Sequence, residues 1–201
     1  MPLPTRGTWC CNILIPRHGH SPQGLVFTQV YDDAEGELLI LGAPGSGKTT
    51  LLLELARDLL ARAQANEQYP MPVVFNLSSW AMKQQPLVDW LVEELNTKYQ
   101  VPRKLAQALL PADQILPLLD GLDEVAPTAR TACIEAINTY RQEHALFPLV
   151  VCSRQADYLA QSGRLLVRSA VIVQPLAQEQ IDVYLAQGGE AGGIAFSRQA
   201  I

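Results

Sequence analysis

Hydrophobic and polar residues alternate along the chain in two recurring patterns. Short runs rich in Val, Leu and Ile predict buried strands, and longer stretches with an apolar residue on each successive turn predict amphipathic helices. The predicted strands are 37–42 (ELLILG), 72–77 (PVVFNL), 114–124 (QILPLLDGLDE, which ends in acidic residues), 147–154 (FPLVVCSR) and 169–176 (SAVIVQPL). The predicted helices are 48–65, 86–99, 128–145 and 177–189.

The order of these elements predicts the class of fold. Strands alternate with helices, and the strands are rich in Val, Leu and Ile, which is typical of a parallel sheet covered by helices on both faces. On the helix at 86–99, we expect one buried face, formed by Leu87, Trp90, Leu91 and Leu95. The sequence therefore predicts an α/β protein with three layers, α/β/α, around a parallel sheet.

The two ends of the chain show neither pattern. Residues 1–24 contain scattered prolines and glycines without a period of 2 or 3.6 residues, and we expect them to form a poorly ordered leader. Residues 189–201 are expected to form an irregular tail. The remaining stretch, 25–188, is long enough to bury one sizeable core, and we expect it to be a single domain.

A glycine-rich stretch, GAPGSGKTT at 42–50, separates the first predicted strand from the first predicted helix. Its glycines let the backbone curl so that several N–H groups point at one anion, and the start of the following helix adds positive potential. The lysine reaches the outer phosphates, and the hydroxyl that follows it ligates Mg²⁺. The alternative is a glycine-rich turn with an exposed lysine. We predict a phosphate-binding loop formed by Gly42, Ala43, Pro44, Gly45, Ser46, Gly47, Lys48, Thr49 and Thr50, with Thr49 as a metal ligand.

An acidic cluster follows the apolar run of the third predicted strand. Asp120 ends that run, at the edge of an open parallel sheet where ligands bind, and we predict that it holds Mg²⁺ opposite Thr49. Asp123 and Glu124 come after the turn at Gly121, and one of them is predicted to accept a proton from an attacking water. We favour Glu124 as this base. The alternative is that both acids only begin the next helix, where negative charge is favourable.

Arg154 ends another buried strand, at the same edge of the predicted sheet. A cation at this place can sense or neutralise a γ-phosphate. It can also pair with an acid of the cluster and only brace the site. The sequence leaves both roles open for Arg154.

Composition and charge narrow the classes of partner. The chain has 201 residues and a net charge of -5, which argues against the broad basic surface used on nucleic acids. It contains no apolar run of the roughly 18 to 20 residues needed to cross a bilayer. Among four cysteines, Cys133 and Cys152 lie in segments predicted to be buried, and we expect free thiols in a reducing compartment. We therefore expect a cytoplasmic protein.

Several segments of the chain together resemble the NACHT domain, a class of signal-transducing P-loop ATPases (STAND) related to the AAA+ proteins. The segments are LLILGAPGSGKTTLLLELA, PVVFNLSSW, LLDGLDEV, VVCSR and VQPL, in this order, and the likeness covers about 27–188. The most telling part is LLDGLDE, because a glycine-containing acidic turn that ends in a catalytic glutamate distinguishes this family from plain AAA+ sequences. The run is most similar to the versions found in large bacterial, especially cyanobacterial, regulators.

The resemblance implies a mechanism and a set of roles. It implies the sheet order of P-loop ATPases with an additional strand, a nucleotide that is ATP or GTP and more often ATP, and a switch in which ADP holds a closed state and ATP an oligomerising one. It implies that Lys48 and Thr49 bind phosphate and Mg²⁺, that Asp120 binds Mg²⁺, that Glu124 serves hydrolysis, and that Arg154 is a sensor.

Family members continue into a small helical domain, a winged helix and a repeat region, and they carry an effector domain at the N-terminus. The given sequence resembles only the nucleotide-binding part, so we expect a truncated chain or a module that works with partners or as a homo-oligomer. Three functions are weighed: a slowly hydrolysing ATPase module of a signalling switch, a nucleotide-binding interaction module without significant hydrolysis, and an AAA+-like ATPase.

Overall fold

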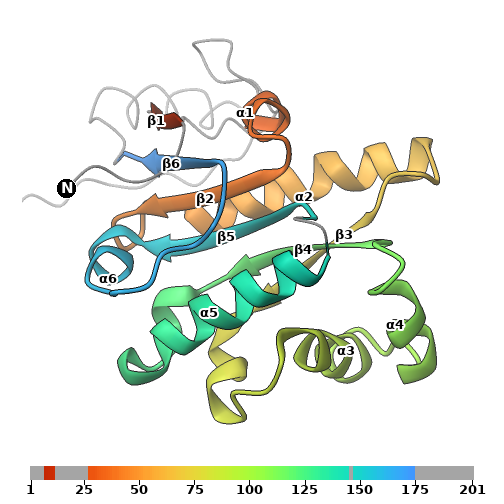
Figure 1. Ribbon diagram of the computed structural model, residues 1–201. Coiled ribbons are helices and arrows are strands. Elements are labelled where there is room, and N and C mark those ends of the chain that lie inside the picture. Colours follow the sequence, from red (N-terminus) through yellow and green to blue (C-terminus); the bar gives the residue numbers. More distant parts are fainter. Residues whose placement is uncertain (1–6, 12–26, 145–146, 175–201) are drawn as a thin grey trace, which may run out of the picture.

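A single parallel sheet forms the centre of the protein. The structure, a computed structural model, describes residues 7–11, 27–144 and 147–174. Its strands are arranged in the order β1-β6-β2-β5-β4-β3, and every neighbouring pair runs parallel (Figure 1). They are β1 (Gly7–Cys11), β2 (Glu37–Gly42), β3 (Met71–Asn76), β4 (Ile115–Asp120), β5 (Leu149–Arg154) and β6 (Ser169–Val173).

Helices cover the two faces of this sheet (Figure 1). They are α1 (Phe27–Asp33), α2 (Lys48–Ala65), α3 (Leu87–Thr97), α4 (Arg103–Leu109), α5 (Pro127–Glu143) and α6 (Gln155–Leu159), and two 3-10 turns are η1 (Leu77–Met82) and η2 (Leu122–Glu124). The predicted three-layer α/β/α fold of a P-loop NTPase is therefore confirmed. The additional strand implied by the family resemblance is also present, because β5 lies between β2 and β4.

Alternate residues of the strands β2 to β6 supply two separate hydrophobic cores. On β2, Leu38 and Ile40 belong to the cluster that contains buried residues of α1 and α2. Leu39 and Leu41 belong to the cluster that contains buried residues of α3 and α5. All four are almost completely buried, and each contributes about 1.5–3 kcal/mol through the removal of apolar surface from water. The two cores fix the β2–α2 junction, where the phosphate-binding loop was predicted.

Several predicted elements match the structure closely, although the strand predicted at 114–124 ends at Asp120 and continues into η2. The strand at 37–42 and the helix at 48–65 have the bounds that the sequence predicted. The predicted apolar face of α3 is buried, at Leu87, Trp90, Leu91 and Leu95. In contrast, α1, α4 and α6 were not predicted, since helices of five to seven residues are too short to show a clear helical period.

One expectation for the N-terminal leader is wrong. Gly7–Cys11 is not irregular but forms the edge strand β1, which pairs in parallel with β6. This pairing joins segments from the two ends of the sequence, and such long-range contacts leave no local periodic signal. The rest of the leader, the predicted helix at 177–189 and the tail at 189–201 lie outside the described residues. The domain limits 25–188 stay a prediction.

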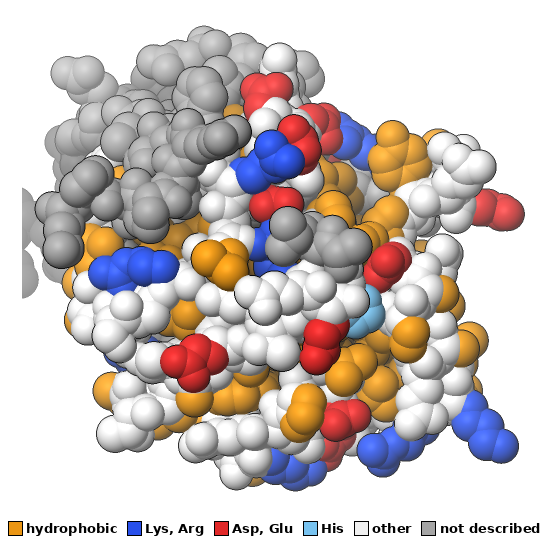
Figure 2. Space-filling view, in the orientation of Figure 1, with side chains coloured by type: hydrophobic (Ala, Val, Ile, Leu, Met, Phe, Trp, Pro, Cys, Tyr) orange, Lys and Arg blue, Asp and Glu red, His pale blue; other side chains and the backbone are white. Residues whose placement is uncertain are grey.

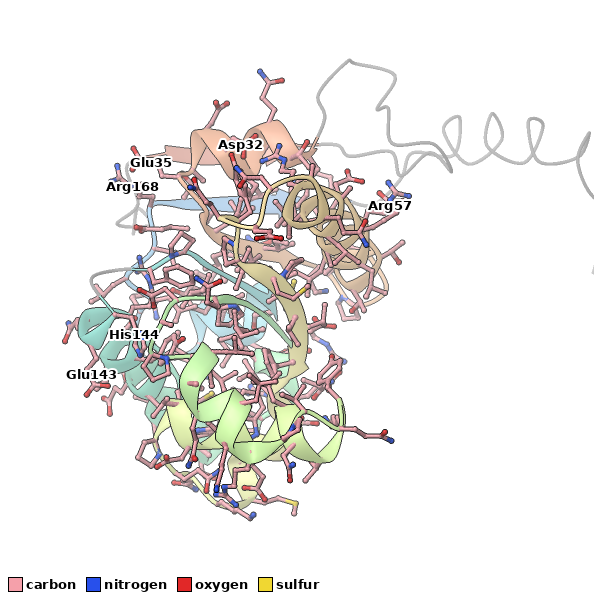
Figure 3. All side chains as sticks on the ribbon, turned by 90° about the vertical axis from the view of Figure 1, so that its right-hand side faces the viewer. Asp32, Glu35, Arg57, Glu143, His144 and Arg168 are labelled. Atoms are coloured by element: carbon pink, nitrogen blue, oxygen red, sulfur yellow. The ribbon has the colours of Figure 1, made fainter. Side chains whose placement is uncertain are left out.

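An ion pair holds the short helix α1 against the helix α2. The Arg62 guanidinium on α2 donates two hydrogen bonds to the Asp32 carboxylate on α1, at 2.6 and 2.7 Å. Figure 3 shows Asp32 on α1 beside the helix α2. Because bidentate pairs hold a fixed geometry, this contact orients α1 against α2.

Charges of both signs are interspersed on the face of the molecule seen in Figure 2. Glu35 and Arg168 form one such pair, at 2.8 Å, and lie next to each other in Figure 3. Within the described part of the chain, no helix is both long and apolar enough to span a membrane.

The two described cysteine side chains are free and fully buried. Burial raises the pKa of the Cys133 thiol to about 12. Burial also raises the pKa of Cys152 well above its ordinary value, and the negative charge of Asp120 adds to this shift.

We expect both thiols to resist alkylation in the folded protein. A thiol with a pKa near 12 is about one part in 10⁴ thiolate at pH 8, and the thiolate is the reactive form. Iodoacetamide at pH 8 followed by peptide mass spectrometry should find Cys133 and Cys152 unmodified in native protein and modified in urea. Equal modification in both conditions would contradict the burial of these residues.

Candidate functional site

The predicted phosphate-binding loop lies between β2 and α2, at the carboxyl edge of the sheet. Gly45 and Gly47 have φ angles of +70° and +89°, which favour glycine. Gly42 is required for space, because a Cβ atom there would lie 2.4 Å from Ser46 Oγ and 3.0 Å from the Val173 carbonyl oxygen. The glycines therefore let this loop curl tightly over the end of the central strand.

The curled loop leaves hydrogen-bond donors without partners. The N-cap of α2, Gly47, has no side chain to accept from the first N–H groups of the helix. The Ser46 hydroxyl is buried and makes no hydrogen bond within the described part of the chain. Buried polar groups are normally satisfied, and a helix N-terminus carries positive potential. These free donors fit an anion such as a phosphate group.

The Lys48 ammonium group closes over the same loop. Its Nζ donates to the carbonyl oxygen of Ala43 at 2.8 Å and to that of Gly42 at 3.3 Å. Both acceptors are neutral carbonyl groups, so a phosphate oxygen is a stronger partner for this cation. Ala43, Pro44, Thr49 and Thr50 are exposed. The nine residues predicted to bind phosphate thus form one continuous loop, which is buried at Gly42 and exposed at five of its other positions.

Thr49 and Asp120 meet across the site. The Thr49 hydroxyl on α2 donates a 2.8 Å hydrogen bond to Asp120 Oδ2 at the end of β4. Hydroxyl and carboxylate oxygens are the ligands that Mg²⁺ prefers, and Mg²⁺ usually takes its remaining ligands from water and phosphate. Among the described residues, no group of three or more His, Cys, Asp and Glu side chains could form an all-protein metal site. The donor set therefore fits a magnesium ion that is shared with a nucleotide.

The two acids of the cluster have different environments. Asp123 Oδ1 accepts from the backbone N–H of Arg154 at 2.9 Å, and Asp123 Oδ2 pairs with Arg154 Nε at 2.8 Å. The Glu124 side chain is exposed, and its Oε2 accepts one hydrogen bond, from Asn76 Nδ2 at 3.0 Å. Both acids lie in η2, and α5 begins after them at Pro127. The two acids therefore do not begin α5, the helix considered in the alternative, but lie in the first turn of the 3-10 helix η2.

Arg154 pairs with Asp123, an acid of the cluster. Its side chain remains about half exposed, at 49%. The ion pair with Asp123 is the contact that a bracing role requires. Arg154 is thus joined through Asp123 to the turn at residues 121–124, which we call the acidic turn.

Asn76 is a residue of this site that the sequence analysis missed. It ends β3 directly beside Asp120 in the sheet register. Its Oδ1 accepts from the Ser78 N–H at 2.8 Å, and this bond assigns the donating Nδ2 to the side of Glu124. The sequence could have indicated Asn76, because it follows an apolar run just as Asp120 does, and that feature was the reason for predicting Asp120.

The fold and this geometry define a P-loop NTPase with an additional strand in its sheet. A comparison with protein families matches the NACHT domain to residues 37–190, and the chain belongs to this family. It is therefore a nucleotide-binding NTPase module, and Mg²⁺ typically accompanies the nucleotide in such domains. Comparison with curated proteins finds no significant match.

Solved structures show a similar fold. The ORC1 protein of Aeropyrum pernix, in complex with DNA, has a TM-score of 0.59 and 18% identity over 82% of this chain and 47% of that one. PCH-2 of C. elegans has a TM-score of 0.44 and 19% identity over 81% of this chain and 43% of that one. The chain thus spans less than half the length of either protein, and the likeness to ORC1 bears on the fold alone.

Proposed function

We propose that this protein binds ATP with Mg²⁺ at the loop Gly42–Thr50 and hydrolyses it slowly, as the nucleotide-binding module of a signal-transduction switch. The observation that carries the proposal is the convergence at one sheet edge of the loop's free donors, the Thr49–Asp120 pair and an exposed acid, Glu124. The switch role and the preference for ATP over GTP are supported by membership of the NACHT family.

Each residue has a defined task in this proposal. The loop N–H groups and the Lys48 ammonium bind the phosphates, and Lys48 exchanges its bonds to the carbonyls of Gly42 and Ala43 for phosphate oxygens. Thr49 and Asp120 would hold Mg²⁺, which neutralises charge that develops on the phosphate oxygens. Glu124 orients the attacking water and accepts its proton.

Asp123 keeps Arg154 at the edge of the site through two contacts. Both oxygens of Asp123 are engaged, whereas the exposed Glu124 accepts a hydrogen bond from the described residues at Oε2 alone. This difference supports Glu124 over Asp123 as the base. Arg154 is then placed to sense the γ-phosphate with the part of its guanidinium that Asp123 does not bind.

A second candidate function is nucleotide binding without significant hydrolysis. The hydrogen bond from Asn76 to Glu124 Oε2 favours it, because this bond occupies one oxygen of the proposed base. In that case the output is assembly with other copies or with partners. An AAA+-like motor is the third candidate, and it is supported only by the fold. We do not extend DNA binding from ORC1 to this chain, whose net charge is -5.

Phosphate release separates these candidates. Purified protein with ATP and excess Mg²⁺ should release phosphate slowly, and the rate should fall to background when EDTA is added. Retention of nucleotide with no phosphate release would establish the binding module instead. Failure of well-folded protein to retain ATP, GTP or ADP would contradict both candidate functions.

A cytoplasmic location is part of the proposal and is supported by the free Cys133 and Cys152.

Asp120→Asn is expected to weaken the use of Mg²⁺ selectively. The substitution keeps the size of the side chain and an oxygen acceptor for Thr49 but removes the negative charge that attracts the ion. We expect the Mg²⁺ concentration for half-maximal phosphate release to rise by about tenfold, which corresponds to about 1.4 kcal/mol. Asp89→Asn, on the exposed first turn of α3, is the matched control and should change nothing. An unchanged magnesium requirement would remove Asp120 from the metal site.

A further inference from the structure

Arg130, near the start of α5, touches the acidic turn of the site but has no part in the proposed chemistry. Its side chain is 12% exposed. Its Nη2 donates to the carbonyl oxygen of Asp123 at 2.6 Å, and its Nε donates to that of Val125 at 2.8 Å. These two carbonyl groups flank Glu124 in the sequence. One guanidinium therefore holds the backbone on both sides of the proposed base.

The third contact of Arg130 reaches a different element. Its Nη1 donates to Asp157 Oδ1 on α6 at 2.7 Å. The helix α6 follows directly after Arg154, and Figure 1 shows α6 and the start of α5 at the same end of the sheet. Arg130 thus ties the acidic turn to the segment that carries Arg154.

Other contacts also hold the acidic turn, among them those of Asn76 with Glu124 and of Arg154 with Asp123, but they do not involve the carbonyl groups beside Glu124. The Glu124 N–H donates to Gly121 O at 2.9 Å, and Leu122 and Val125 are buried on either side of the turn. These contacts fix where the turn starts and ends, but among the described residues only Arg130 bonds to the carbonyl groups next to Glu124. A rigid fork with several donors is suited to this task, and lysine cannot reproduce it.

We propose that Arg130 is a positioning residue for the hydrolysis reaction: its guanidinium bridges the carbonyl oxygens of Asp123 and Val125 and the carboxylate of Asp157, and thereby fixes Glu124 relative to the bound nucleotide. This inference rests on the proposed function. In this inference Arg130 does not contact the nucleotide. Loss of the Arg130 side chain should therefore lower kcat and leave nucleotide affinity intact, because a small displacement of Glu124 slows the reaction.

The test compares Arg130→Met with Arg164→Met in the full chain. Arg164 is the matched control, because it also donates to backbone carbonyls, those of Leu159, Gln161 and Gly163, but lies over Tyr158 and does not touch the acidic turn. We expect Arg130→Met to lower kcat by about 10- to 100-fold with the Kd for ATP unchanged within about twofold. Arg164→Met should leave both values near those of the unmodified protein.

Two further measurements decide the remaining outcomes. If Arg130→Met does not fold, Arg130→Lys replaces it. We expect a kcat below that of the unmodified protein, since the single nitrogen of an ammonium group cannot take the places of Nε, Nη1 and Nη2 at three separate acceptors. An unchanged kcat in a folded Arg130 variant, or a parallel loss of kcat and affinity, overturns the inference. If the unmodified protein releases no phosphate, the proposed function fails instead. Hydrogen exchange at the Glu124 amide then decides on Arg130, with at least about tenfold faster exchange expected in Arg130→Met than in Arg164→Met.

Discussion

Glu124→Gln is expected to bind ATP and Mg²⁺ normally and to lose nearly all phosphate release. Glutamine keeps the size of the side chain and an oxygen that accepts from Asn76, but it cannot take a proton from water. General bases contribute about 10²- to 10⁴-fold to a rate, so we expect kcat to fall by about that factor. Phosphate release under saturating ATP measures the rate, and calorimetric titration measures the affinity.

Two companion variants make this result specific. Glu135→Gln lies on the exposed side of α5 and should behave as the unmodified protein. Asp123→Asn should disturb the pairing with Arg154 and lower the rate less than Glu124→Gln does. If Asp123→Asn is inactive while Glu124→Gln turns over normally, Asp123 is the base, and the preference for Glu124 is wrong.

Lys48→Ala is expected to abolish tight nucleotide binding. The ammonium is the charged donor at the loop, and a hydrogen bond to a charged group contributes about 1.5–3 kcal/mol. A loss of about 3 kcal/mol raises the Kd for ATP by roughly 100-fold. The fold should survive, because among the described residues Lys48 bonds only to carbonyl groups of its own loop. Titration with a fluorescent ATP analogue in excess Mg²⁺ measures the change.

Lys104→Ala, on the exposed side of α4, is the control for the lost charge. It removes the same side chain from a position away from the phosphate-binding loop and should leave the Kd unchanged. Circular dichroism of both variants should match the unmodified protein. An unchanged Kd in folded Lys48→Ala would remove the loop Gly42–Thr50 from nucleotide binding, and the proposed function would fall with it.

The division of roles within the acidic cluster illustrates what structure adds to a motif. From the sequence, Asp123 and Glu124 are neighbouring carboxylates with similar chemistry. In the structure, Arg154 engages both oxygens of Asp123, and Asn76 engages one oxygen of Glu124. Arg154 ends β5 and Asn76 ends β3, so the two partners come from two different strands. The positions of Arg154 and Asn76 at the ends of their strands therefore decide that Asp123 is paired through both oxygens and that Glu124 is bonded through one.

The sequence by itself determined the features that depend on neighbouring residues. The strand Glu37–Gly42, the loop that follows it and the helix Lys48–Ala65 are contiguous, and apolar runs, glycines and helix formers act over a few residues. Asp120 was also predictable, because an acid at the end of an apolar strand must lie at the sheet edge.

The tertiary structure alone decided the features that join distant segments. The edge strand β1 exists because it pairs with β6, and the contacts of Asn76 and Arg130 with the acidic turn exist because separate elements end at the same edge of the sheet. The energy of such contacts comes from hydrogen bonds between residues far apart in the chain, and these form only after the two hydrophobic cores have fixed the sheet.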